Sequence, residues 1–347
     1  MRQQGNIQLN LFQITRQPNG DKIMKKYHVT MLLAPLLLAN FVQTSTLDQC
    51  QISLKFDNCL GIASFPSGDT YEGEWMNGLP HGSGKYIYAS NSSYDGEWFK
   101  GNEHGFGTYI GKDQIYTGNH KHGKRDGYGT AKFTNGSKYI GEFKDGKRHG
   151  FGSDYLADGS TFTGNYIHGK RSGLGNHLFV SGDSYLGDWK NDLFHGYGIY
   201  RFADGSQYSG EHLNGKKNGK GVFLFKSGNK YIGDINNDMK DGFGREFFKD
   251  GSYYNGSFKD GQRNGQGTFI FKSGNKYVGE IKNNEYDGKG TFTGPNNIEN
   301  SGVWKKGFLL NDLCKAAGFE YDSNDSKLCI DEFLNSDELF EDFINGQ

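Results

Sequence analysis

A repeating pattern of aromatic, glycine and polar positions runs through most of the chain. In a clear copy, Tyr139, Gly141 and Phe143 occupy alternate positions, and Gly150-x-Gly152 follows after a polar turn. Side chains of a strand alternate between its two faces, so the first three residues share one face of a short strand. The Gly-x-Gly, with an aromatic residue four positions later in most copies, predicts a second strand. Each copy therefore predicts one β-hairpin.

Ten such copies follow one another, and their lead aromatic residues are 23 residues apart except for one step of 22. Numbering each copy from this residue gives positions 1 to 23. Asn77-Gly78 near one end of a copy and Asp204-Gly205 near the other end are typical of tight turns. We therefore predict an all-β fold, an elongated, solenoid-like rod made of a single antiparallel meander of repeated hairpins, with a short C-terminal helix. The lead residues are Tyr71, Tyr94, Tyr116, Tyr139, Phe162, Tyr185, Tyr208, Tyr231, Tyr254 and Tyr277.

Glycine makes up 54 of the 347 residues, and 45 of these lie at positions 3, 8, 12, 14 and 21 of the pattern. Collagen needs Gly at every third residue together with abundant Pro, and this chain has only 5 Pro. Disordered chains lack aromatic residues, which are 15% of this chain. Both classes are excluded, and the glycines indicate an ordered backbone that turns tightly or lies beneath rings.

The consensus Tyr-x-Gly-x-Trp/Phe-x-x-Gly-x-x-His/Asn-Gly-x-Gly resembles the MORN (membrane occupation and recognition nexus) repeat. A degenerate eleventh copy contains Trp304, and the residues from Cys59 match the end of a missing copy. The resemblance implies a hairpin array that serves as an interaction module. Some MORN proteins carry a fused kinase or methyltransferase domain, but the 40 residues after Gly307 are too few for either. Departures from the consensus include His120 and His212 at position 5, Asp192, Asp238 and Asn284 at position 8, and one residue missing before Tyr116.

The overall charge indicates no nucleic-acid partner, because 39 Lys and Arg balance 40 Asp and Glu. A local basic row is nevertheless expected along the first hairpin turns, where it could bind acidic phospholipid or another polyanion. Acidic residues at position 4, such as Glu74 and Glu142, nearly balance this row, so a solvated mixed surface is the alternative. The row consists of Lys124, Arg125, Lys147, Arg148, Lys170, Arg171, Lys216, Lys217 and Arg263.

The aromatic face of the sheet is a second candidate binding surface, because large exposed apolar patches mark interaction sites. The alternative is that these rings form the core, since a single sheet has little else to bury. The candidates are Tyr71, Trp75, Tyr94, Trp98 and Trp189.

The region before the array, residues 1–47, resembles a secretory signal peptide if synthesis starts at Met24. Lys25 and Lys26 form a basic segment, and the apolar run 31–39 and a polar stretch follow. The run is too short for a stable transmembrane helix, and a buried hairpin or capping strand is the alternative. We therefore expect an exported protein, periplasmic or extracellular, with a membrane-associated cytoplasmic protein as the alternative.

Four cysteines flank the array and none lies within it. Their even number and local pairing predict the disulfides Cys50-Cys59 and Cys314-Cys329, which would staple the two ends in an oxidising compartment. Free thiols in a cytosolic protein are the alternative. Neither pair has the Cys-x-x-Cys spacing of a zinc site.

Four regions follow from this pattern: the extension 1–47, a cap or half repeat 48–70, the array 71–307, and an acidic cap 308–347. In the last region, nine acidic residues and one Lys lie between Glu320 and Gln347. Ser336 is a candidate N-cap, and the apolar residues after it are spaced for one face of a short amphipathic helix. We expect this helix to pack on the open end of the sheet.

No catalytic or metal-binding pattern emerges. His81, His104, His149 and His195 all occupy position 11, but copies ~10 Å apart cannot share one ion with ~2 Å bonds. Asp and Asn at the same position in other copies favour a role in the turn. We therefore predict a non-enzymatic scaffold without metal or cofactor, which binds an unknown protein through its sheet face or groove. Acidic phospholipid at the basic edge is the alternative partner.

Overall fold

The computed structural model describes residues 8–16, 22–30, 48–50, 56–320 and 323–346, and the chain divides into units Met1–Thr46 and Leu47–Gln347. In the first unit, β1 (Gln8–Arg16) and β2 (Lys22–Thr30) form an antiparallel hairpin. The basic segment of the predicted signal peptide lies in β2. Its apolar run, 31–39, lies outside the described residues, so the signal peptide stays a prediction.

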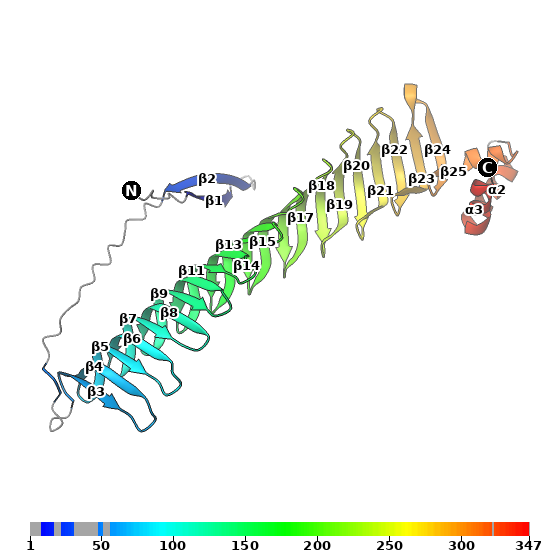
Figure 1. The fold of residues 1–347 in the computed structure, drawn as a ribbon. Coiled ribbons are helices and arrows are strands. Elements are labelled where there is room, and N and C mark those ends of the chain that lie inside the picture. The colour runs from blue at the N-terminus through cyan, green and yellow to red at the C-terminus, as the bar shows by residue number, and fades with distance from the viewer. Residues whose placement is uncertain (1–7, 17–21, 31–47, 51–55, 321–322, 347) are drawn as a thin grey trace. The chain divides into compact units, whose positions relative to one another are not determined.

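The second unit is a single open antiparallel sheet of 23 strands, in which each strand pairs with the next one in sequence (Figure 1). The predicted meander is confirmed, and β3 and β25 are its two ends. The strands are β3 (Cys59–Ser64), β4 (Thr70–Met76), β5 (Leu79–Ile87), β6 (Ser93–Phe99), β7 (Asn102–Ile110), β8 (Gln114–Lys121), β9 (Lys124–Phe133), β10 (Lys138–Lys144), β11 (Lys147–Tyr155), β12 (Thr161–Ile167), β13 (Lys170–Leu178), β14 (Ser184–Lys190), β15 (Leu193–Arg201), β16 (Gln207–Leu213), β17 (Lys216–Leu224), β18 (Lys230–Asn236), β19 (Met239–Phe247), β20 (Tyr253–Lys259), β21 (Gln262–Ile270), β22 (Lys276–Lys282), β23 (Glu285–Thr293), β24 (Glu299–Lys305) and β25 (Phe308–Leu309).

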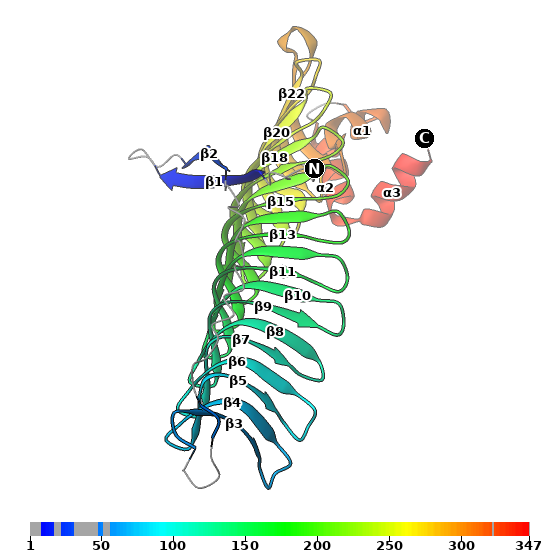
Figure 2. The ribbon, with the colours of Figure 1, turned by 60° about the vertical axis from the view of Figure 1, so that its left-hand side comes forward.

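Each copy of the sequence pattern forms one hairpin, as predicted, and the hairpins are stacked side by side (Figure 2). At the first turn, Asn77 and Gly78 have φ of 50° and 73°, the left-handed conformations that a two-residue hairpin loop requires. Just after the turn, the pairing register shifts between positions 3 and 5 of most copies, which is a β-bulge. The bulge residue is the Gly of position 12, such as Gly82 with φ of 57°.

The lead aromatic residues form the core, and all ten are 0% exposed. Tyr71 lies across its own hairpin, where a Cβ added to Gly84 would come 2.2 Å from its Oη. The Tyr71 hydroxyl donates to the carbonyl oxygen of Glu74 at 3.0 Å, and eight other lead Tyr residues repeat this bond. We call this side of the sheet the ring face, and the opposite side the open face.

Further rings cover the lead residues on the ring face, at positions 5, 16 and 18 of the pattern. The indole Nε1 of Trp98 donates to the Gly84 carbonyl of the preceding copy at 2.9 Å, so the Trp residues join neighbouring hairpins. Half-buried rings at positions 16 and 18 form a ladder, with Phe202 and Phe223 5.7 Å apart and Phe223 and Phe225 4.4 Å apart. The core therefore consists of the lead rings and the rings that cover them, all on one side of one sheet.

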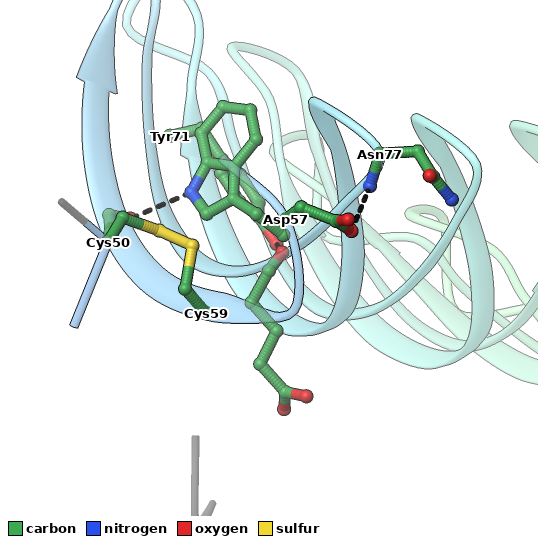
Figure 3. The surroundings of a disulfide bond; sticks show 8 residues. Cys50, Asp57, Cys59, Tyr71 and Asn77 are labelled. Atoms are coloured by element: carbon green, nitrogen blue, oxygen red, sulfur yellow. Dashed lines mark hydrogen bonds between the residues drawn. A yellow bond between two sulfur atoms is a disulfide. The ribbon is translucent and has the colours of Figure 1, made fainter. Parts of the chain in front are cut away.

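The N-terminal end of the sheet is covered by a short segment held by the Cys50–Cys59 disulfide (Figure 3). The Phe56 ring lies 4.8 Å from that of Trp75, and the Asp57 carboxylate accepts a hydrogen bond from the Asn77 amide at 2.8 Å. This segment replaces the missing first strand of a complete copy, so it caps the sheet.

Three helices cover the C-terminal end, where one was predicted: α1 (Leu310–Ala316), α2 (Asn324–Asn335) and α3 (Asp337–Asn345). The predicted helix is α3, and its N-cap Ser336 accepts from the Leu339 amide as expected. The Cys314–Cys329 disulfide joins α1 to α2, and Phe340 of α3 is fully buried between the helices and β24. None of the helices in the described part of the chain is long and apolar enough to cross a membrane.

Candidate functional site

The predicted basic row divides into two rows on opposite faces of the sheet. Neighbouring residues of a strand point to opposite faces, so each Lys-Arg or Lys-Lys pair places one cation on each side. The cations at position 9 are exposed on the open face, and those at position 10 are half-buried on the ring face. The first group is Lys124, Lys147, Lys170 and Lys216, and the second is Arg125, Arg148, Arg171, Lys217 and Arg263.

The ring-face cations lie over the lead aromatic rings. The Arg125 guanidinium carbon is 4.8 Å from the Tyr116 ring centroid, and the same arrangement recurs for Arg148 over Tyr139 at 5.0 Å. Lys240, which the sequence analysis did not select, occupies the same position over Tyr231 at 5.1 Å. Cation–π contacts of this kind stabilise the folded state by about 0.5–2 kcal/mol each. These cations therefore help to cover the rings of the core.

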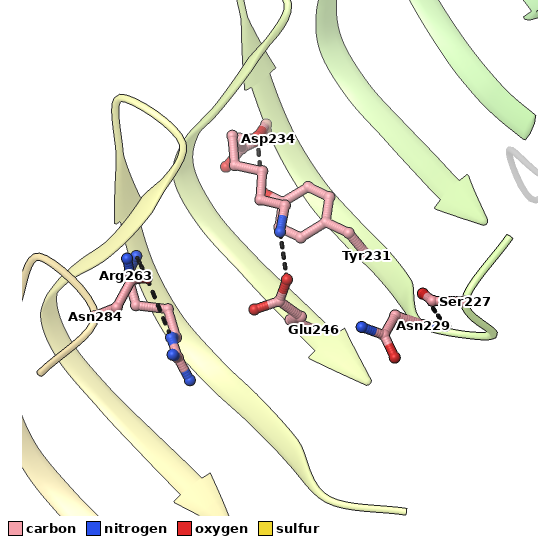
Figure 4. A network of polar contacts seen from close by, with 8 residues as sticks. Ser227, Asn229, Tyr231, Asp234, Glu246, Arg263 and Asn284 are labelled. Atoms are coloured by element: carbon pink, nitrogen blue, oxygen red, sulfur yellow. Dashed lines mark hydrogen bonds and ion pairs between the residues drawn. The ribbon is translucent and has the colours of Figure 1, made fainter. Parts of the chain in front are cut away.

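Most of these cations also have a polar partner on the ring face. Arg148 pairs with the buried Asp154 at 3.0 Å, and Asp154 also accepts a hydrogen bond from the Tyr166 hydroxyl at 2.5 Å. Figure 4 shows a similar cluster, in which Glu246 points toward the Tyr231 ring and pairs with Lys240. Because most of the ring-face cations already have a polar partner, few of them are available to bind a polyanion.

The five aromatic residues considered as a binding surface lie in the core instead. Each is 6% exposed or less, because neighbouring rings and position-10 side chains cover it. A ligand approaching the ring face therefore meets the covering side chains first. The exposed fractions are 0% for Tyr71 and Tyr94, 4% for Trp75, 6% for Trp98 and 5% for Trp189.

The open face carries a row of exposed apolar side chains at position 13, which the sequence analysis missed. We call it the apolar row. Tyr197 also occupies position 13, and a groove of about 490 Å³ lies between it and Phe243, lined in part by Val222 and Ile232. Residues of successive copies stand two strands, or ~10 Å, apart. The exposed members are Phe106 at 53%, Tyr128 at 59%, Phe151 at 52%, Leu174 at 43% and Phe243 at 56%.

The acidic residues of position 4 serve the bulge of their own hairpin. The Glu97 carboxylate accepts from the Phe106 amide at 2.9 Å, and that of Glu142 accepts from the Phe151 amide at 3.1 Å. Charged acceptors of this type form strong hydrogen bonds, and the amide of a bulge has no ladder partner. Position 4 therefore has a structural role besides its charge.

Lysines are dense on the open face in the third to fifth copies. Lys121 lies directly opposite Lys124, and Lys144 lies directly opposite Lys147. Position 4 is Asn rather than an acid in the third and fifth copies. Like charges opposite each other destabilise a hairpin, and Lys124 offsets part of this repulsion through its ion pair with Asp145 at 3.4 Å.

No group of three or more possible metal ligands occurs among the described residues. Position 11, with His81 and His104, lies in the second strand and not in the turn as expected, and the positive φ falls on the Gly of position 12. At other positions, burial lowers the pKa of His120, His177 and His212 to about 4, so these imidazoles are neutral core groups.

The chain was compared with curated proteins and with solved structures. No curated protein matches the chain. The SAS-4 (dCPAP) TCP domain of Drosophila melanogaster, solved in complex with a proline-rich motif of Ana2 (dSTIL), is 14% identical over 44% of this chain and 84% of that chain, with a TM-score of 0.29. A streptogramin B lyase is 11% identical over 75% of this chain and 87% of that chain, with a TM-score of 0.14. At these scores neither likeness bears on fold or function.

The model of the MORN repeat matches ten consecutive segments of the array. The matched segments are residues 71–93, 94–114, 116–138, 139–161, 162–184, 185–207, 208–230, 231–253, 254–276 and 277–298. They cover more than half of the chain and coincide with the hairpins. The chain therefore belongs to the MORN repeat family.

Proposed function

We propose that the chain is a non-catalytic scaffold that binds a protein partner through the apolar row of the open face. MORN repeats are generally modules that interact with proteins or lipids. The observation that carries the proposal is that Phe106, Tyr128 and Phe151 are each more than half exposed on consecutive copies. Aromatic residues are enriched at the centres of protein interfaces, and exposed rings on consecutive copies are typical of an interaction surface.

The charges beside the row favour an acidic partner. Lys121, Lys124, Lys144 and Lys147 lie on the same face as the row and in the same copies. Protein interfaces usually have aromatic residues at the centre and charged residues at the rim. The partner is expected to place apolar side chains on the rings and acidic side chains over the lysines.

The experiment is affinity capture from the native host with the double variant Phe106→Ser/Phe151→Ser. A partner retained by the wild-type chain is expected to be lost by this variant, because anchor side chains at the centre of an interface contribute about 2 kcal/mol or more each. Val180→Ser is the matched control, because Val180 is 70% exposed but lies in a loop. Capture of the same partner by the double variant would contradict the proposal.

A second candidate function is binding of acidic phospholipid, which the facing lysine pairs of the open face favour. Each lysine near an anionic membrane contributes about 1 kcal/mol, and salt screens this attraction. Vesicles of phosphatidylserine and phosphatidylcholine should therefore bind at low salt and release at high salt. Lys144→Gln/Lys147→Gln should weaken binding by about tenfold or more.

The control for this experiment is Lys282→Gln, since Lys282 faces Glu285 in the tenth copy. It should bind vesicles as the wild type does. If vesicles of phosphatidylcholine alone bind equally well, or if no vesicle binds at low salt, the lipid candidate is excluded.

We further propose that the protein works in an oxidising compartment outside the cytoplasm. The support is the two disulfides, one at each end of the array. Such bonds persist in secreted and periplasmic proteins and are rare in the cytosol. Thiol labelling of the protein taken from its native host, without reductant, should modify none of the four cysteines.

A further inference from the structure

The shortened second copy, residues 94–115, departs from the others at two further positions. Position 18, a ring in most copies, is Gly111, whose amide donates to the Gln114 carbonyl as the Phe133 amide donates to that of Ser137. Position 10, a cation in six copies, is Glu103. The second copy thus lacks a covering ring and carries the opposite charge on the ring face.

A pocket of about 500 Å³ lies beside these changes. It is lined by Glu103, Tyr109, Gln114, His120, Gly123, Lys124, Arg125 and Gly146. The Glu103 side chain is 15% exposed, and its carboxylate accepts a hydrogen bond from the Tyr88 hydroxyl at 2.9 Å. Its other oxygen lies 3.6 Å from His120 Nε2, and His120 is a neutral group at physiological pH. A carboxylate in this position is desolvated, and burial raises the pKa of Glu103.

Arg125 also lines the pocket and differs from its counterparts in other copies. Within the described residues its guanidinium makes no hydrogen bond or ion pair. It lies over the rings of Tyr116 and Phe143 and is within electrostatic reach of Glu103. The corresponding cations Arg148, Arg171, Lys217, Lys240 and Arg263 each have a polar side-chain partner. The planar fork of a guanidinium is suited to bind a carboxylate through two hydrogen bonds.

We propose that this pocket binds a small zwitterion of the α-amino-acid type, with its carboxylate on Arg125 and its ammonium group on Glu103. Each end of the ligand carries the charge opposite to that of the protein group it meets, and Glu103 and Arg125 attract each other without a direct ion pair. Tyr109 offers a ring to the ligand side chain, and Gln114 offers an amide. The site is separate from the apolar row, because Glu103 and Arg125 point to the ring face.

The test is a melting-temperature screen of the whole chain against the twenty common amino acids, each at millimolar concentration. A ligand that binds the folded state raises the melting temperature. The best binder is then compared by titration calorimetry with its N-acetyl form, which lacks the ammonium group, and its methyl ester, which lacks the carboxylate. Both changes should weaken binding tenfold or more. If no amino acid binds, or if either analogue binds as well as the parent, the proposal is wrong.

Two variants locate the site. Glu103→Gln and Arg125→Met should each weaken binding of the amino acid tenfold or more. The control is Glu246→Gln, which removes a ring-face carboxylate of a distant copy. If a pocket variant fails to fold, the analogue comparison on the wild-type chain still decides the question. Wild-type affinity in a folded Glu103→Gln variant would place the ligand elsewhere and overturn the assignment.

Discussion

The aromatic residues of the ring face are buried in the core, whereas those of the open face are exposed to solvent. On the ring face, Tyr231 is fully buried, donates a hydrogen bond to the Asp234 carbonyl and lies under Lys240. On the open face, Tyr128 belongs to the same hairpin pattern but is 59% exposed. A ring that the fold does not cover contributes little to stability, so the contrast separates residues that maintain the array from residues that are available to a partner.

The largest expected effect is the loss of stability when a buried ring of the ring face is removed. Tyr231→Ala should lower the free energy of unfolding by about 3–5 kcal/mol, because it leaves a cavity among packed rings. The matched variant Tyr128→Ala should change it by about 0.5 kcal/mol or less. Urea unfolding of both variants measures the difference. Equal losses would show that the two faces do not differ as described.

A smaller effect comes from the buried histidines of the ring face. The pKa of His212 is about 4 in the folded chain, below the ordinary value of 6.5, because burial disfavours the charged form. The unfolded state then binds more protons between pH 6.5 and 4, so stability is full above this window and falls as the pH is lowered through it. The neutral His212 should therefore lower the free energy of unfolding by about 1 kcal/mol at pH 5.5 relative to pH 7.5.

His212→Phe should remove this part of the pH dependence and keep the packing, since Phe143 and Phe258 occupy the same position in other copies. His212→Asn, which neither titrates nor packs, should remove the same pH dependence but lower stability at all pH values. Unfolding by urea at the two pH values measures both. A His212→Phe chain as acid-sensitive as the wild type would contradict the assignment.

The smallest expected effect comes from changing the charge of single lysines on the open face. Lys144→Glu replaces a facing pair of like charges with an ion pair to Lys147, so it should raise stability by about 0.2–1 kcal/mol. Lys282→Glu does the reverse, because it faces Glu285, and should lower stability by a similar amount. Thermal unfolding at low salt resolves the two signs. A stabilised Lys144→Glu chain that also loses vesicle binding would indicate that the lysine pair is kept for binding.

Sequence periodicity was enough to predict the hairpins, their turns and both disulfides, because each is encoded in a single copy or a local pair. It did not predict which face each basic residue occupies. The pattern groups Arg125 with Lys124 because both follow the first turn, whereas the alternation of side chains along the strand places the two on opposite sides.

The apolar row could have been found in the sequence, since Phe106, Tyr128, Phe151, Tyr197 and Phe243 share position 13. Without the bulge, however, these residues could not be assigned to a face. Helices α1 and α2 were missed for a different reason. Leu309, the N-cap of α1, makes no side-chain cap that would mark the start of a helix. The pocket beside Glu103 depends on contacts between three hairpins, which a single copy does not encode.

The shortened copy also indicates how an array of this kind can change its length. Its missing residue falls in the loop between β7 and β8, and Gly107 still pairs with Gly118 as the equivalent residues do elsewhere. Losing one residue inside a strand would instead turn every following side chain to the wrong face. The array can therefore gain or lose whole 23-residue units. Single residues can be gained or lost only in the loops at the hairpin ends far from the bulge, such as the loop between β7 and β8.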